Sequence, residues 1–98
     1  MIHVGSIRLD LDRKRVRCHG REATLTPRLT HLLKTLMEHP GEALEREYLF
    51  RIVWNTEYMG DTRTLDVHIS WLRRAIEENP RKPRLLKTIR GVGYRLDA

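Results

Sequence analysis

Cysteine is almost missing from this sequence, because Cys18 is the only one in 98 residues. An internal disulfide is therefore impossible, and nothing indicates an oxidising compartment. No run approaches the roughly 18 consecutive apolar residues that a membrane-spanning helix requires. The amino terminus has neither the apolar stretch nor the cleavage site of a secretory signal. We therefore expect a cytoplasmic protein with no membrane partner and with a buried or idle Cys18 thiol.

Side chains arranged for catalysis or metal binding are also scarce. The histidines form no pair with the spacing of a known metal site, and Cys18 has no second cysteine with which to hold zinc. No serine or cysteine stands in a recognisable nucleophile context. We therefore expect a protein that is not an enzyme and that has no metal and no cofactor. A hydrolase or redox protein that uses Cys18 is the alternative these residues favour least.

Acidic residues are absent from one stretch of the chain, residues 81–95. This stretch contains the basic residues Arg81, Lys82, Arg84, Lys87, Arg90 and Arg95, whereas the 13 basic and 13 acidic residues elsewhere cancel. The formal net charge of +6 therefore comes from one short segment. Such a localised positive field is expected where a protein meets a phosphate backbone, while an acidic membrane surface and a merely solvated charged face stay open as alternatives.

The length suits one domain, residues 1–98, with one modest core. In the first quarter, apolar residues alternate with charged ones, which predicts short antiparallel strands at 7–11, 16–18 and 23–25, with residues 2–4 as an added edge strand. Near the end, residues 85–90 and 94–96 predict a hairpin whose tip is residues 91–93. With the three helices described next, this order is that of an α+β domain.

Two helices are predicted in the middle of the chain from apolar residues spaced by three and four. Thr26 can cap the first helix and Pro27 suits its first position, while residues 39–41, His-Pro-Gly, supply its stop. Its apolar face comprises Leu29, Leu32, Leu33, Leu36 and Met37. The second helix covers about 45–53, and on it we expect Leu49, Ile52 and Val53 to be buried.

A third helix is predicted after a loop at residues 55–60, from an N-cap at Asp61 or Thr62 to about residue 78. Its apolar stripe is Leu65, Ile69, Leu72 and Ile76. At about 100° per residue, the opposite face carries Arg63, Val67, Ser70, Trp71 and Arg74, with Asp66 and Arg73 on one flank. Valine, serine and tryptophan among arginines suit a DNA groove, where polar groups meet base edges and apolar atoms meet thymine methyls.

Other interpretations of this helix face are a tryptophan covered by a neighbouring element, and a protein interface in which Trp71 is a hot spot. The predicted hairpin favours the DNA-binding interpretation. Glycines at 91 and 93 allow backbone angles closed to other residues, and Arg90 stands beside this narrow tip. A minor groove attracts such an arginine. Residues 91–93 do not form a nucleotide-binding loop, because a strand follows them where a helix would be needed.

Long motifs in this chain resemble the effector domain of OmpR/PhoB-type two-component response regulators. They are DTRTLDVHIS at 61–70, LRR at 72–74 and TIRGVGYRL at 88–96. Shorter matches are LTP at 25–27, HPG at 39–41 and VW at 53–54, so the resemblance extends over almost the whole chain. It implies a winged helix-turn-helix with an N-terminal four-stranded antiparallel sheet, three helices and a C-terminal β-hairpin wing.

The resemblance also implies sequence-specific binding of double-stranded promoter DNA for transcription regulation, with helix 62–78 in the major groove and the wing, 85–96, in the minor groove. The residues implied to face bases are Asp66, Val67, Ser70 and Trp71. Those implied to contact phosphates are Trp54, Arg63, Thr64, His68, Arg73, Arg74, Thr88 and Tyr94. Arg90 is implied to enter the minor groove.

The family further implies RNA polymerase as a partner, contacted through the loop that carries Glu57 and Tyr58. It implies a monomeric isolated domain that forms a tandem dimer on direct-repeat DNA, and a phosphoacceptor receiver domain that this sequence does not contain. The sequence departs from the usual family pattern at three places. The first and second helices lack the glutamate of a capping box, which is expected to cost about 1 kcal/mol each, and Trp71 occupies a position where a basic residue is common.

Overall fold

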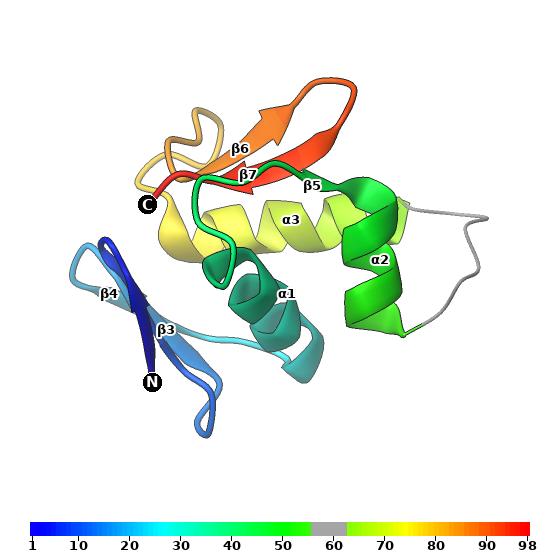
Figure 1. The fold of residues 1–98 in the computed structure, drawn as a ribbon. Helices are drawn as coiled ribbons and strands as arrows, with labels where there is room; N and C mark the ends of the chain where they lie inside the picture. The colour runs from blue at the N-terminus through cyan, green and yellow to red at the C-terminus, as the bar shows by residue number, and fades with distance from the viewer. Residues whose placement is uncertain (56–62) are drawn as a thin grey trace.

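The computed structural model describes residues 1–55 and 63–98. Four strands open the chain: β1 (Ile2–Val4), β2 (Ile7–Asp10), β3 (Arg15–Cys18) and β4 (Arg21–Thr24). The helices and a short strand follow: α1 (Pro27–Met37), β5 (Leu44–Glu45), α2 (Arg46–Trp54) and α3 (Arg63–Ile76). The hairpin strands are β6 (Leu86–Ile89) and β7 (Gly93–Leu96). The predicted α+β winged-helix arrangement is confirmed (Figure 1).

The first four strands form one antiparallel meander in the order β1-β2-β3-β4. Ile7 pairs with Cys18 and Leu9 with Val16, and these four side chains are buried on the inner face of the sheet. Alternation along each strand therefore turns the charged residues to the outer face. The fourth strand covers Arg21–Thr24 and not 23–25, because it pairs with the whole of β3, from Cys18 opposite Arg21 to Arg15 opposite Thr24. Leu25, the next residue, is buried in the core.

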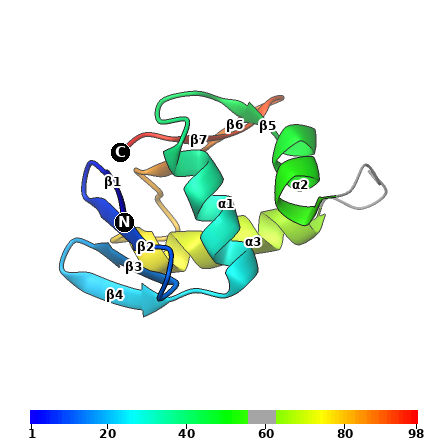
Figure 2. The ribbon, with the colours of Figure 1, turned by 60° about the horizontal axis from the view of Figure 1, so that its bottom comes forward.

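Helix α1 forms as the sequence predicts. The Thr26 side chain accepts a hydrogen bond from the Leu29 N–H at 3.1 Å, and Pro27 occupies the first turn. The helix ends at Met37, before the His-Pro-Gly stop. Its five apolar positions are all buried. The helix lies between the four-stranded sheet and α2, as both views in Figures 1 and 2 show.

Helix α2 corrects two expectations. It covers Arg46–Trp54 and not 45–53, because Leu44 and Glu45 form a strand that pairs with β7 in a second, three-stranded sheet, β5-β7-β6. Ile52 was expected to be buried, but 39% of it is exposed, and Phe50 lies in the core instead. Leu49 and Val53 lie about 40° apart around the helix, and Phe50 and Ile52 lie at similar angles on opposite sides of them. The helical period alone therefore could not decide which of the two is buried.

Helix α3 crosses the molecule with the N-terminal sheet near its end and α2 near its beginning (Figures 1 and 2). The apolar stripe Leu65, Ile69, Leu72 and Ile76 is completely buried. The helix stops at Ile76, two residues earlier than expected. The expected N-cap at Asp61 or Thr62, and the loop residues Glu57 and Tyr58, lie outside the described residues. Among the helices of the described segments, none has the length and apolarity needed to cross a bilayer.

Candidate nucleic-acid interface

The outward face of α3 is where the periodicity places it. Val67 is 45% exposed and Trp71 44% exposed, although both side chains are large and apolar. Arg63, Ser70 and Arg74 are exposed beside them. Trp71 is thus not covered by a neighbouring element, so one of the alternative interpretations of this helix is removed. An exposed surface of this kind, rimmed by polar residues, is typical of a binding site.

Trp71 belongs to a row of aromatic rings that extends from α2 to α3. Phe50 stacks on Trp54 with ring centroids 5.1 Å apart, and Trp54 meets the edge of His68 at 4.9 Å. His68 in turn lies 5.0 Å from Trp71 and donates from Nδ1 to the Thr64 carbonyl oxygen at 2.8 Å. The guanidinium of Arg28 lies over Trp54, 5.2 Å from the ring centroid. The predicted phosphate contacts Trp54 and His68 therefore adjoin the predicted base contact Trp71.

A second group of predicted residues meets on the flank of α3 that faces the hairpin. The carboxylate of Asp66 accepts from the Arg46 guanidinium at 2.6 Å through Oδ2 and from the Tyr94 hydroxyl at 2.5 Å through Oδ1. Tyr94 is 7% exposed. Burial, together with the hydrogen bond to Asp66, raises the pKa of Tyr94 to about 12. Both oxygens of Asp66 are therefore engaged within the protein.

Arg73 makes a parallel set of contacts two turns further along α3. Its Nε donates to the Leu86 carbonyl oxygen at 3.0 Å and its Nη2 to the Thr88 hydroxyl at 2.8 Å. The guanidinium also lies over the Tyr94 ring, 5.8 Å from the centroid. The structure thus joins Asp66, Arg73, Thr88 and Tyr94, four residues expected at DNA, through contacts with one another and with Arg46.

The hairpin presents Arg90 at its turn, exposed and, within the described part of the chain, without a carboxylate at ion-pair distance. Gly91 has φ of +78°, as the turn requires. Gly93 does not adopt a positive φ, so the expectation for that glycine was wrong. It is required instead because a Cβ there would collide with the Leu44 carbonyl oxygen on β5. A groove between this turn and Arg46, Glu47 and Asp66 adjoins the exposed face of α3.

Sequence reasoning missed two residues that organise this surface. No sequence pattern indicated that Arg46 belongs to this surface, because its partner Asp66 is 20 positions away in the chain. Glu77 is 2% exposed and accepts from the backbone N–H groups of Arg84, Leu85 and Leu86 at 2.8 to 3.1 Å. Its own carbonyl oxygen accepts from Arg21. Glu77 therefore fixes the entry to the hairpin against the end of α3.

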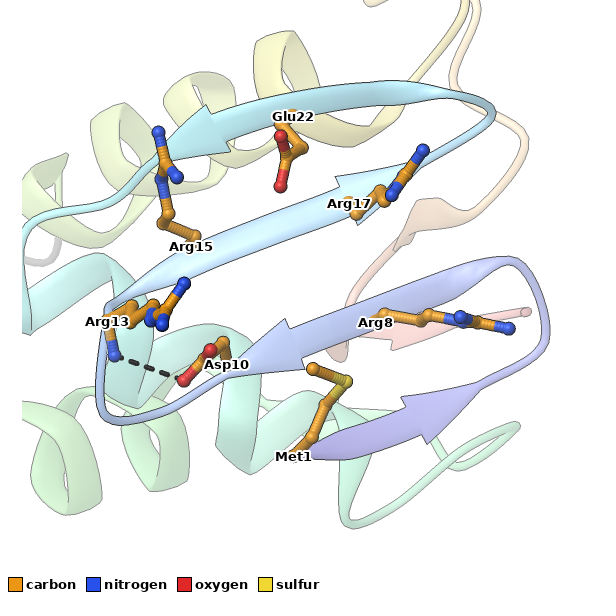
Figure 3. Close-up of a pocket in the computed structure, with 7 residues that line it drawn as sticks. All are labelled: Met1, Arg8, Asp10, Arg13, Arg15, Arg17 and Glu22. Carbon is orange, nitrogen blue, oxygen red and sulfur yellow. Dashed lines mark hydrogen bonds between the residues drawn. The ribbon is translucent and has the colours of Figure 1, made fainter.

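A further basic surface lies on the outer face of the four-stranded sheet, where Figure 3 shows a cleft with arginines from β2, β3 and the turn between them. Arg8 lies directly opposite Arg17 in the strand register, and like charges in this position repel. The lining residues are Met1, Arg8, Asp10, Arg13, Arg15, Arg17 and Glu22. Positive charge on the surface is thus not confined to residues 81–95.

The buried thiol of Cys18 belongs to the core, as expected, and burial raises its pKa. A thiol in this state is a poor nucleophile. Within residues 1–55 and 63–98 no three side chains of histidine, cysteine, aspartate or glutamate are grouped so that they could hold a metal ion.

Known proteins resemble this chain in both sequence and fold. The family described as "Transcriptional regulatory protein, C terminal" matches residues 20–96. The chain is 48% identical over 82 residues to the alkaline phosphatase synthesis transcriptional regulatory protein SphR of Synechococcus elongatus, over 84% of this chain and 32% of SphR. It spans between 32% and 50% of the length of the first curated relatives that it matches.

Solved structures of such domains superpose on almost the entire chain. The Klebsiella pneumoniae RstA DNA-binding domain, in complex with the RstA box, matches with a TM-score of 0.84 and 30% identity over 98% of this chain and 95% of that one. DrrB, a Thermotoga maritima OmpR/PhoB homolog, matches with a TM-score of 0.83 and 31% identity over 98% of this chain and 43% of DrrB.

Proposed function

The chain belongs to the OmpR/PhoB-type family of C-terminal domains of transcriptional regulatory proteins, and from this premise we propose that it binds double-stranded promoter DNA sequence-specifically. The observation that carries the proposal is the outward face of α3, where Val67 and Trp71 are exposed among arginines. A helix of this composition fits a major groove. The related RstA domain, of closely similar fold, is bound to a DNA element.

Each part of the surface has its own task in this proposal. Val67, Ser70 and Trp71 read base edges, and Asp66 lies beside them on the flank that meets the hairpin. Arg90 enters the minor groove at the hairpin turn. The phosphate backbone is held by Trp54, Arg63, Thr64, His68, Arg73, Arg74, Thr88 and Tyr94. Of these, Tyr94 is the most buried, and its ring supports Arg73.

Family resemblance alone supports the remaining parts of the proposal. They are a cytoplasmic location, contact with RNA polymerase through the loop that carries Glu57 and Tyr58, a monomeric free domain and a tandem dimer on direct repeats. They also include a non-enzymatic role as the effector half of a regulator whose receiver domain supplies the signal.

Selection of bound sequences from a pool of random duplexes tests the DNA-binding proposal directly. At fixed salt concentration we expect one motif, preferred over random DNA by about a thousandfold, and the spacing of half-sites shows whether two copies bind in tandem. Flat enrichment across the pool would rule out sequence-specific binding. If no salt-sensitive complex with any duplex formed, the exposed Trp71 would instead belong to a protein interface.

A further inference from the structure

We propose that Asp66 is a positioning residue that locks α3 to the hairpin, and not a residue that reads bases. The proposal rests on the DNA-binding function above. The carboxylate joins three elements, because Arg46 begins α2 and Tyr94 lies on β7. These partners lie 20 and 28 positions from Asp66 in the sequence.

A carboxylate that reads bases accepts a hydrogen bond from cytosine N4, and for this it must be turned toward the groove. Both oxygens of Asp66 instead accept bonds of 2.6 Å and 2.5 Å from groups of the protein. Hydrogen bonds to a charged group are among the strongest in proteins. The side chain is also half-buried, and its orientation is set from two directions. Asp66 is therefore engaged before any DNA arrives.

A second attachment point makes the lock rigid. Arg73 lies seven positions after Asp66, which is about two turns or roughly 10 Å along the helix axis, and it binds Leu86 and Thr88 on β6. Two contacts at this separation resist rotation of the helix relative to the hairpin, which one contact would allow. Both attachments include Tyr94, because Arg73 lies over its ring.

The lock sets the distance between the two DNA-binding elements. Thr88, which Arg73 holds, is two residues before Arg90, and Tyr94 is the first residue after Gly93 on the other strand of the hairpin. The position of Arg90 relative to Val67 and Trp71 thus depends on the Asp66 and Arg73 contacts. Because the helix and the hairpin are already held in position, less conformational entropy is lost on binding. This favours a duplex that fits both elements at once.

Two conservative variants test the lock. Tyr94→Phe removes only the hydroxyl that donates to Asp66, and Asp66→Asn keeps the size of the side chain but removes its charge. Tyr48→Phe and Asp12→Asn are matched controls, because Tyr48 lies on α2 beside His39 and Asp12 lies in an exposed turn. All are compared with the native domain by selection from random duplexes and by affinity for the selected site.

For both test variants we expect about a tenfold loss of affinity for the selected site, since each removes a hydrogen bond to a charged group. The preferred bases should stay the same, and the double variant should bind no more weakly than the weaker single variant. A changed base preference in Asp66→Asn alone would show that Asp66 reads bases and would overturn the proposal. So would additive losses or unchanged affinities.

Amide hydrogen exchange of the free protein gives a second readout that needs no DNA. Tyr94→Phe should speed exchange at least threefold in β6, β7 and the first turns of α3 and leave the four-stranded sheet unchanged, whereas Tyr48→Phe should change neither. Equal exchange in Tyr94→Phe and the native domain would overturn the lock. If the native domain selected no motif while exchange changed as expected, the DNA-binding proposal would fail and the lock would stand.

Discussion

Gly91 and Gly93 are two positions apart, yet the backbone needs them for different reasons. A Cβ at Gly91 meets nothing within 4 Å, but its φ of +78° is costly for other residues. Gly91→Ala should therefore lower the free energy of unfolding by about 1 kcal/mol. Gly93→Ala should lower it by about 3 kcal/mol, because the backbone of β5 cannot move away from the added methyl group. Denaturant titrations compare the two, and equal losses would contradict the collision at Gly93.

Glu77 is a buried carboxylate, and its oxygens accept hydrogen bonds from the backbone N–H groups of residues 84–86. In Glu77→Gln one oxygen becomes an NH₂ group, which cannot accept these bonds. We expect the free energy of unfolding to fall by about 2 kcal/mol. Glu78→Gln is the matched control, because the Glu78 side chain is 72% exposed and lies 3.7 Å from His19. Thermal unfolding measures both, and equal shifts would show that the buried contacts contribute nothing.

Tyr94 makes stability depend on pH in alkaline solution. Its pKa is raised to about 12 by burial and by the bond to Asp66, so the fold favours the protonated hydroxyl. The stabilisation is complete below the ordinary tyrosine pKa of about 10 and is lost as the pH rises through the folded value. The stability advantage of the native domain over Tyr94→Phe should therefore shrink as the pH rises from about 10 to about 12. Denaturation midpoints of both proteins at several pH values measure it, and a constant difference would argue against the raised pKa.

Helix α3 and the hairpin are expected to divide the work of binding. Trp71→Ala removes an exposed side chain from the helix face, so it should change which bases are preferred. Arg90→Ala removes a charge from the hairpin turn, so it should weaken binding about tenfold without changing the bases chosen by the helix. Selection from random duplexes, with affinities at one salt concentration, measures both effects. Similar results for the two variants would mean that the two elements do not have separate tasks.

Most elements could be predicted from the sequence because their signals are local. The spacing of Leu65, Ile69, Leu72 and Ile76 determined the buried face of α3, and Thr26 with Pro27 determined where α1 begins. Strand β5 has only two residues, too few for any period, and exists because β7 pairs with it. The burial of Phe50 in place of Ile52 likewise depends on where α2 begins after that strand.

The candidate site could likewise be predicted where its signal is local to one element, and not where it depends on packing between elements. The angle around α3 correctly placed Val67 and Trp71 on the exposed face. The engagement of Asp66 by Arg46 and Tyr94 could not be predicted, because these residues come together only when three elements pack. Motif resemblance assigned Asp66 and Tyr94 to DNA without showing that they contact each other. Pairwise contacts between distant residues are thus the information that the fold adds.

Two separate surfaces of the molecule carry exposed arginines and could contact the phosphates of DNA. The hairpin carries Arg90 without an acidic neighbour at ion-pair distance among the described residues. The outer face of the four-stranded sheet carries Arg8, Arg15 and Arg17, but Asp10 and Glu22 lie among them (Figure 3). The two carboxylates would repel phosphates, so we expect the sheet face to remain outside the DNA contact.

Salt dependence separates local phosphate contacts from the general attraction of a domain with net charge +6. If about six phosphates are neutralised, affinity should fall roughly a thousandfold between 50 and 200 mM salt, because the bound counterions are released on binding. Arg90→Ala should reduce the slope of log K against log salt by about one unit. Arg17→Ala changes the net charge equally but lies on the outer face of the sheet, so it should leave the slope unchanged. Fluorescence anisotropy with one labelled duplex measures all three slopes. Equal reductions in both variants would mean that overall charge, and not the hairpin, governs the electrostatic part of binding.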